Sequence, residues 1–123
     1  MACIRDYFKS GIINTVDQMI SRINNDYREG YQFGTQDWKK VMRKSYSFLT
    51  ALKQELDYYQ KYQYFDNKYM LYDTAVEFKK YMNSSLFQEA VELSKVGAIG
   101  IMTPYMVNTL NNLVEFCELV CES

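Results

Sequence analysis

The sequence contains three cysteines and fifteen acidic residues but no histidine, so few of its side chains could carry out catalysis. Without histidine there is no Ser-His-Asp or Cys-His catalysis, no histidine metal ligand and no imidazole switch near neutral pH. Cys117 and Cys121 are one helical turn apart, and Cys3 lies at the other end of the chain. That spacing suits neither a disulfide nor a zinc site without further soft ligands. We therefore predict no metal site and no cofactor, with Cys117 and Cys121 as small buried side chains.

The acidic residues and the glycines form no recognisable catalytic arrangement either. Glutamates recur three residues apart, as in Glu89 with Glu92, but such pairs are common on solvated helix surfaces. The glycine-containing stretch 96–100 follows a predicted helix and lacks the Lys-Ser/Thr of a phosphate-binding loop. These observations favour a protein that is not an enzyme.

Two clusters of residues could instead form a binding surface, and the first is basic. Lys39, Lys40, Arg43 and Lys44 fall within little more than one helical turn, and their spacing predicts that all four point to one side of a helix. Four neighbouring cations suit a phosphate group or an acidic partner. The alternative is an ordinary solvated helix face, because the chain as a whole has a net charge of −1.

The second cluster is aromatic. The chain has twelve tyrosines, and seven aromatic residues occupy fifteen positions from 58 to 72. Tyrosine combines a large apolar area with a hydroxyl and little side-chain entropy, so it is enriched in protein interfaces. It also stacks on nucleic-acid bases, and it packs well in small helical domains. The tyrosines predicted to bind are Tyr58, Tyr62, Tyr64, Tyr69 and Tyr72.

Apolar residues recur every three or four positions along most of the chain, which predicts an all-α fold. We expect one domain, residues 1–123, folded as a compact bundle of about five helices with short antiparallel connections. Ser10-Gly11 interrupts the first apolar stripe and either kinks or splits the first helix. The predicted helices span residues 3–28, 36–62, 67–82, 86–96 and 104–121.

Within these helices the sequence predicts the core residues and the helix starts. The helix 36–62 carries a heptad-like seam that is polar only at Ser45, namely Trp38, Met42, Ser45, Leu49, Leu52, Leu56 and Tyr59. Asp66 is the predicted cap of 67–82, and Ser85 with Gln88 forms a capping box for 86–96. The helix 86–96 is expected to turn Leu86, Ala90 and Leu93 inward, and Thr103-Pro104 begins the last helix.

Charge is distributed unevenly along these helices. Residues 35–65 contain six basic and three acidic side chains, whereas the chain from residue 97 contains three acidic side chains and no basic one. The simplest interpretation is intramolecular, with the basic helix 36–62 packed beside the acidic helix 104–121 and their flanking charges fixing the pairing.

The remaining sequence features concern location and partners. The chain begins without an apolar signal segment, no stretch is long enough to span a membrane, and the cysteines form no disulfide framework, so we expect a cytoplasmic protein. We expect it to bind another protein or itself through the tyrosine-rich segment 58–72, with the Lys39–Lys44 region at the rim. Inhibition is one form of such binding, and the composition is compatible with a phage or viral accessory protein. The alternative is a nucleic-acid or nucleotide binder that uses the same cations for phosphates and the same tyrosines for stacking.

Overall fold

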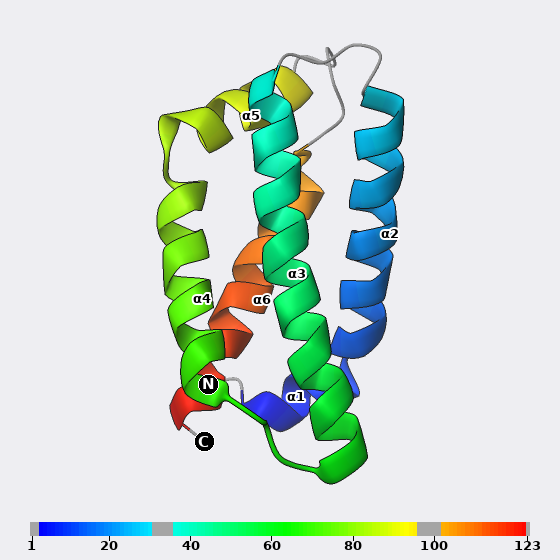
Figure 1. The fold of residues 1–123 in the computed structure, drawn as a ribbon, viewed down its shortest axis with the longest axis vertical. Coiled ribbons are helices and arrows are strands. Elements are labelled where there is room, and N and C mark those ends of the chain that lie inside the picture. The colour runs from blue at the N-terminus through cyan, green and yellow to red at the C-terminus, as the bar shows by residue number, and fades with distance from the viewer. Residues whose placement is uncertain (1–2, 31–35, 96–101, 123) are drawn as a thin grey trace.

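Four long helices run along the molecule in the computed structural model, which describes residues 3–30, 36–95 and 102–122. Two short helices cross the ends of this bundle, α1 at one end and α5 at the other (Figure 1). In the described ranges there are six helices and no strand, which confirms the predicted all-α class. The helices are α1 (Ile4–Lys9), α2 (Ile12–Gly30), α3 (Gln36–Tyr62), α4 (Lys68–Met82), α5 (Ser85–Lys95) and α6 (Pro104–Glu122). The end predicted at residue 96 lies outside the described residues.

The interruption at Ser10-Gly11 splits the first predicted helix into α1 and α2. Gly11 has a φ of 82°, in the left-handed region that favours glycine, and its amide donates to the carbonyl oxygen of Phe8 at 3.1 Å. The chain changes direction at this point, so α1 turns across the end of the bundle while α2 runs along it (Figure 1).

The core forms where the apolar faces of the long helices meet, and the heptad seam of α3 is largely as predicted. Its residues from Trp38 to Leu56 are buried, including Ser45, and Tyr59 is half-buried. Two residues that the sequence predicts to be buried differ in the structure. Leu93 of α5 is exposed, because Phe87 and Val91 face the core beside Ala90, and Cys121 of α6 is only half-buried. Phe116 of α6 is fully buried against the Tyr7 and Phe8 rings of α1.

Two helix starts are shifted by one residue from the prediction. The cap of α4 is Asn67 rather than Asp66, since its Oδ1 accepts the Met70 amide at 3.0 Å. The cap of α5 is Ser84 rather than Ser85, since its hydroxyl accepts the Phe87 amide at 3.3 Å. In each case the neighbouring polar residue was an equally good capping type, so composition alone did not distinguish them.

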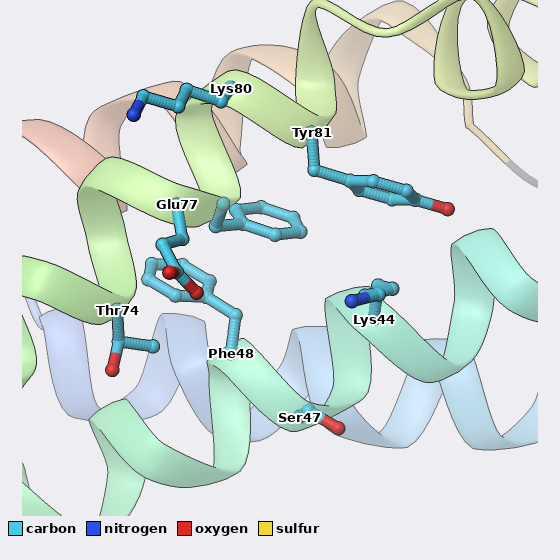
Figure 2. Close-up of a pocket in the computed structure, with 8 residues that line it drawn as sticks. Lys44, Ser47, Phe48, Thr74, Glu77, Lys80 and Tyr81 are labelled. Carbon is cyan, nitrogen blue, oxygen red and sulfur yellow. The ribbon is translucent and has the colours of Figure 1, made fainter.

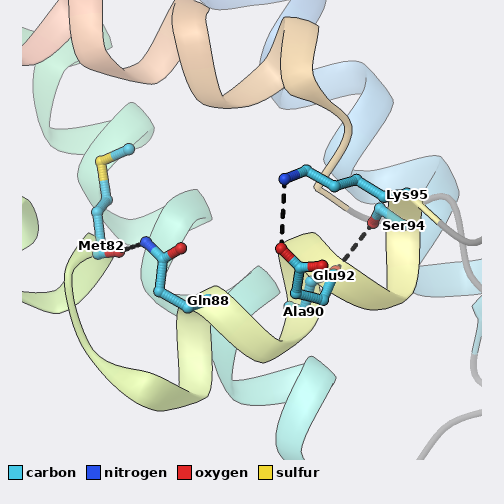
Figure 3. A network of polar contacts seen from close by, with 6 residues as sticks. All are labelled: Met82, Gln88, Ala90, Glu92, Ser94 and Lys95. Atoms are coloured by element: carbon cyan, nitrogen blue, oxygen red, sulfur yellow. Dashed lines mark hydrogen bonds and ion pairs between the residues drawn. The ribbon is translucent and has the colours of Figure 1, made fainter.

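Helix α5 is fixed by polar contacts at both of its ends (Figure 3). Gln88 does not complete a capping box; its Nε2 donates to the Met82 carbonyl at 2.8 Å and ties α5 to the end of α4. At the other end the Ser94 hydroxyl donates to the Ala90 carbonyl at 3.0 Å and accepts the Met102 amide at 2.7 Å. The last helix begins as predicted, with the Thr103 hydroxyl accepting the Met106 amide at 3.3 Å.

The charged residues do not pair the helices in the expected way. Helix α3 packs mainly against α2, and α6 packs mainly against α4, so the predicted pairing of α3 with α6 is wrong. Lys53 of α3 forms a salt bridge with Asp17 of α2, and Lys79 of α4 lies 3.5 Å from the Glu118 carboxylate of α6. Surface ion pairs contribute only about 0–1 kcal/mol each, so the fit of the apolar faces outweighs the charge asymmetry.

Candidate functional site

Three predicted binding residues, Tyr58, Tyr62 and Tyr64, gather at the end of α3, and we call them the tyrosine cluster. The ring centroids of Tyr58 and Tyr62 are 4.6 Å apart, and those of Tyr58 and Tyr64 are 5.5 Å apart in an edge-to-face arrangement. The Tyr58 hydroxyl donates to the Tyr64 hydroxyl over 3.3 Å. Tyr62 and Tyr64 nevertheless remain 47% and 59% exposed, so the tyrosine cluster presents ordered aromatic surface to solvent.

The tyrosine cluster depends on a turn at Gln63 that the sequence did not predict. Gln63 has a φ of 65°, and its amide donates to the Tyr59 carbonyl at 2.7 Å. This left-handed residue ends α3 and turns the chain back, which brings Tyr64 against Tyr58. Glycine or asparagine usually occupies such a position, so a glutamine gives no sequence signal for it.

The residues that follow Tyr58 and Tyr64 in the chain, Tyr59 and Phe65, make a second set of aromatic contacts toward the inside of the bundle. The rings of Tyr59 and Phe65 are 4.5 Å apart, on either side of the Gln63 turn. Tyr59 also stacks on Phe8 of α1 at 4.8 Å, and Phe65 meets Phe116 of α6 edge-on at 6.2 Å. Because these contacts join α1, α3 and α6, the position of the tyrosine cluster is set by three helices.

The surroundings of Tyr58 favour its neutral phenol. The hydrogen bond to Tyr64 is the main cause that raises the pKa of Tyr58 to about 12, since the bond is lost when the Tyr58 proton leaves. The Lys61 ammonium lies 5.3 Å from the centre of the Tyr62 ring, within the range of a cation–π contact. The Tyr62 ring therefore has a cation beside it, whereas the negative charge of Asp66 contributes to the raised pKa of Tyr58.

Tyr69 and Tyr72 of α4 stand apart from the tyrosine cluster. Tyr69 is 65% exposed, and the Lys68 ammonium lies 5.7 Å from its ring centre. Tyr64 and Tyr69 both line a shallow hollow of about 480 Å³, so Tyr69 adjoins the tyrosine cluster across this space. Tyr72 is 36% exposed and does not line the hollow. The structure thus brings four of the five predicted tyrosines to one end of the bundle.

The four basic residues of α3 do not share one face as predicted. Lys39 is only 9% exposed, whereas Lys40 is exposed to solvent. The Arg43 guanidinium donates to the Tyr27 hydroxyl of α2 at 3.4 Å, and the Lys44 ammonium lies 5.7 Å from the Tyr81 ring of α4. Arg43 and Lys44 therefore lie on opposite flanks of α3, because successive residues in a helix are about 100° apart.

The basic residues are also distant from the tyrosine cluster. Lys44 and Tyr58 are fourteen residues apart on α3, or about 21 Å along the helix axis at about 1.5 Å per residue. The basic residues therefore lie in the half of α3 opposite to Tyr58 and Tyr62 (Figure 1). The Lys39–Lys44 region accordingly does not form the rim of the tyrosine cluster.

The remaining reactive side chains form no further site in the described residues. Burial is the main cause that raises the pKa of the Cys117 thiol well above its usual range, so this thiol is protonated at neutral pH. No group of three or more cysteine, aspartate or glutamate side chains in the described part of the chain could hold a metal ion. None of the described helices is long and apolar enough to cross a membrane.

Comparison with known protein families, curated proteins and solved structures finds no match to this chain.

Proposed function

We propose that this protein is a non-enzymatic interaction protein that binds a partner protein through the tyrosine cluster. The observation that carries the proposal is the exposure of Tyr62 and Tyr64. Their arrangement is held by ring contacts and by the hydrogen bond from the Tyr58 hydroxyl to the Tyr64 hydroxyl. Exposed aromatic side chains are characteristic of interface hot spots, where tyrosine is among the most enriched residues.

The order of the tyrosine cluster supports this proposal further. Binding normally costs about 0.5–1.5 kcal/mol for each flexible side chain that becomes fixed. Tyr58, Tyr62 and Tyr64 already contact one another, and Tyr59 and Phe65, which follow Tyr58 and Tyr64 in the chain, are fixed by a ring contact of their own. A partner would therefore gain aromatic contact area at a reduced entropic cost. A cytoplasmic location, and inhibition as one outcome of binding, belong to this same proposal.

Binding of single-stranded nucleic acid is the second candidate function. It is favoured by Lys61 and Lys68, whose ammonium groups lie beside the exposed rings of Tyr62 and Tyr69. Stacking of bases on such rings with cations nearby is a common mode of single-strand binding. The basic residues of α3 do not add to this site, because they lie in the other half of the helix.

The test compares the wild-type protein with Tyr62→Ala/Tyr64→Ala and with Tyr105→Ala as a matched control. Tyr105 of α6 is 64% exposed, and it lies outside the tyrosine cluster. Each protein is used to capture partners from native lysate, and its oligomeric state is measured by analytical ultracentrifugation. We expect a captured protein, or self-association, that is lost in the double variant and retained in Tyr105→Ala.

The same experiment distinguishes the two candidates. Capture of nucleic acid that weakens steeply with salt and requires the tyrosine cluster would favour the second function. A partner that binds the double variant as well as the wild type would refute a role for the tyrosine cluster in either function.

A further inference from the structure

The tyrosine cluster brings two phenol hydroxyls into direct contact. The Tyr58 hydroxyl donates to the Tyr64 hydroxyl over 3.3 Å, and the two ring centroids are 5.5 Å apart at an interplanar angle of 81°. In a phenol the carbon atoms ortho to the hydroxyl group are only two bonds from the oxygen. Contact between the two hydroxyls therefore brings ortho carbons of Tyr58 and Tyr64 close together at the edges of their rings.

This pairing of phenols is specific to the tyrosine cluster. In the described part of the chain, every ring contact between two tyrosines lies within it. Tyr81 provides the contrast, because its ring neighbours are Phe78 and Phe87, which carry no hydroxyl. Figure 2 shows the Tyr81 hydroxyl directed away from Phe48, with Lys44 beside the ring. The contacts of Tyr81 with phenylalanine rings therefore give it no second phenol to react with.

The paired hydroxyls are accessible from solvent through Tyr64. Its side chain is 59% exposed, whereas Tyr58 is half-buried. Because the Tyr64 oxygen accepts the hydrogen of Tyr58, the hydroxyl hydrogen of Tyr64 is directed elsewhere and can pass to water. A diffusible oxidant can therefore remove an electron from Tyr64 while its proton leaves to the solvent. The hydrogen bond then allows a hydrogen atom to move from Tyr58 to the Tyr64 radical, so either ring can carry the radical.

We propose that Tyr58 and Tyr64 form an intramolecular dityrosine cross-link when the protein meets a one-electron oxidant, such as the oxidised intermediates of haem peroxidases. Each phenol loses one electron to the oxidant and one proton to water, which leaves a phenoxyl radical with unpaired electron density on its ortho carbons. The two radicals couple through a new carbon–carbon bond between ortho carbons. Each coupled carbon then releases its hydrogen as a proton, and each oxygen gains one, which restores two phenols. The protein loses two hydrogen atoms in all, and two equivalents of oxidant are each reduced by one electron.

Tyr62 is the competing partner for this reaction. Its ring centroid is 4.6 Å from that of Tyr58 and 6.3 Å from that of Tyr64. Tyr58 and Tyr62 are both held on α3 one turn apart, whereas Tyr64 follows the turn at Gln63 and is the most exposed of the three. Tyr64 can therefore rotate its ring edge toward Tyr58 without moving the helix. The hydroxyl contact, rather than distance along the sequence, selects the pair that reacts.

This reaction is separate from the proposed protein interaction, because it takes place in the isolated protein and requires no partner. Failure of the cross-link would leave the proposed interaction unaffected, and absence of a partner would leave the cross-link unaffected. The two proposals are therefore tested separately, although both concern the tyrosine cluster.

The experiment is photo-oxidation of the dilute, isolated protein with tris(bipyridyl)ruthenium and persulfate, which is reduced to sulfate. The exposed Cys3 is alkylated first so that its thiol does not consume the oxidant. We expect a monomeric product with dityrosine fluorescence, at a yield per molecule that does not change with protein concentration. Mass spectrometry of its peptides should show Tyr58 joined to Tyr64 with the loss of two hydrogen atoms.

Phenylalanine variants identify the reacting pair, because each keeps the aromatic ring and removes the phenol. Tyr58→Phe and Tyr64→Phe should each lose the cross-linked monomer, whereas Tyr62→Phe should retain it. Tyr105→Phe is the matched control for exposure and should also retain it. Tyr105 is 64% exposed and makes no ring contact with another described residue. Far-UV circular dichroism of each variant checks that the helices remain folded.

Oxidation in urea separates the effect of the fold from that of the sequence. In the unfolded chain the pair from 62 to 64 is closer along the sequence than the pair from 58 to 64, so links should spread over several pairs. The proposal is overturned if Tyr64→Phe keeps the monomeric link, if the folded protein forms intermolecular links alone or none, or if the folded and unfolded proteins give the same linked peptides.

Discussion

Replacement of Gln63 tests whether a single left-handed residue positions the tyrosine cluster. Its φ of 65° lies in a region that costs a residue with a Cβ atom about 1–2 kcal/mol. Gln63→Gly removes this strain, and Gln63→Val increases it because a branched side chain is restricted further there. We therefore expect opposite effects on stability from two substitutions at one exposed position.

The expected magnitudes follow from three contributions. Gln63→Gly gains about 1–2 kcal/mol from relief of strain and loses about 0.4–1 kcal/mol to the greater freedom of glycine in the unfolded chain. It also loses the exposed side-chain bond of Gln63 to the Gln60 carbonyl, which is 3.2 Å long. The net gain should be about 0.5 kcal/mol. Gln63→Val should instead lose about 1–2 kcal/mol, so the two variants should differ by about 2 kcal/mol.

Urea unfolding followed by far-UV circular dichroism measures these free energies. Gly11→Ala provides the converse control, since Gly11 has a φ of 82° and no atom lies within 4 Å of an added Cβ. It should lose about 1 kcal/mol from backbone strain alone. If Gln63→Val were as stable as Gln63→Gly at an unchanged m-value, the left-handed conformation of Gln63 would not be what ends α3 and brings Tyr64 into contact with Tyr58.

Three further predictions follow from single side chains. In an alkaline titration followed by tyrosinate absorbance, one phenol should ionise near pH 12, and Tyr64→Phe should lower the pKa of Tyr58 because its hydrogen-bond acceptor is lost. Because the pKa of Tyr58 is raised, its hydrogen bond stabilises the folded protein fully below about pH 10, and this stabilisation is lost as the pH rises through about 12. A Tyr58 pKa unchanged in Tyr64→Phe would contradict the bond. Ser45→Ala should raise the free energy of unfolding by about 1 kcal/mol in urea, because the buried Ser45 hydroxyl has no partner among the described residues; a destabilised variant would indicate a hydrogen bond instead. Iodoacetamide at neutral pH should modify the exposed Cys3 readily and the buried Cys117 only in denaturant, as mass spectrometry can establish; equal rates in the folded protein would contradict this burial.

Most of the fold was predictable because helical periodicity is a local property of the sequence. The seam from Trp38 to Leu56 and the start at Thr103-Pro104 were found from spacing and capping chemistry alone. The errors occurred where neighbouring residues of the same type compete, as at Ser84 and Ser85. They also occurred where the orientation of a helix depends on its neighbours, as for Leu93, which is exposed while Phe87 and Val91 face the core.

The candidate site was predictable only in its residue types. Segment 58–72 was singled out by its aromatic content, but the contact of Tyr64 with Tyr58 requires the turn at Gln63, which has no sequence signature. The basic residues of α3 do not form one surface, because other helices pack against both flanks of α3. The Arg43 guanidinium donates to the Tyr27 hydroxyl of α2, and the Lys44 ammonium lies beside the Tyr81 ring of α4.

The sequence by itself determined the helical class, the apolar faces and the absence of histidine chemistry, because these depend on residue identity and local spacing. Only the tertiary structure decided which helices are neighbours, since apolar faces of similar width can pair in several ways and surface charges are too weak to choose. The same packing placed Phe48 against Phe78, with their ring centroids 4.6 Å apart. This contact joins two residues thirty positions apart in the sequence, which periodicity does not predict.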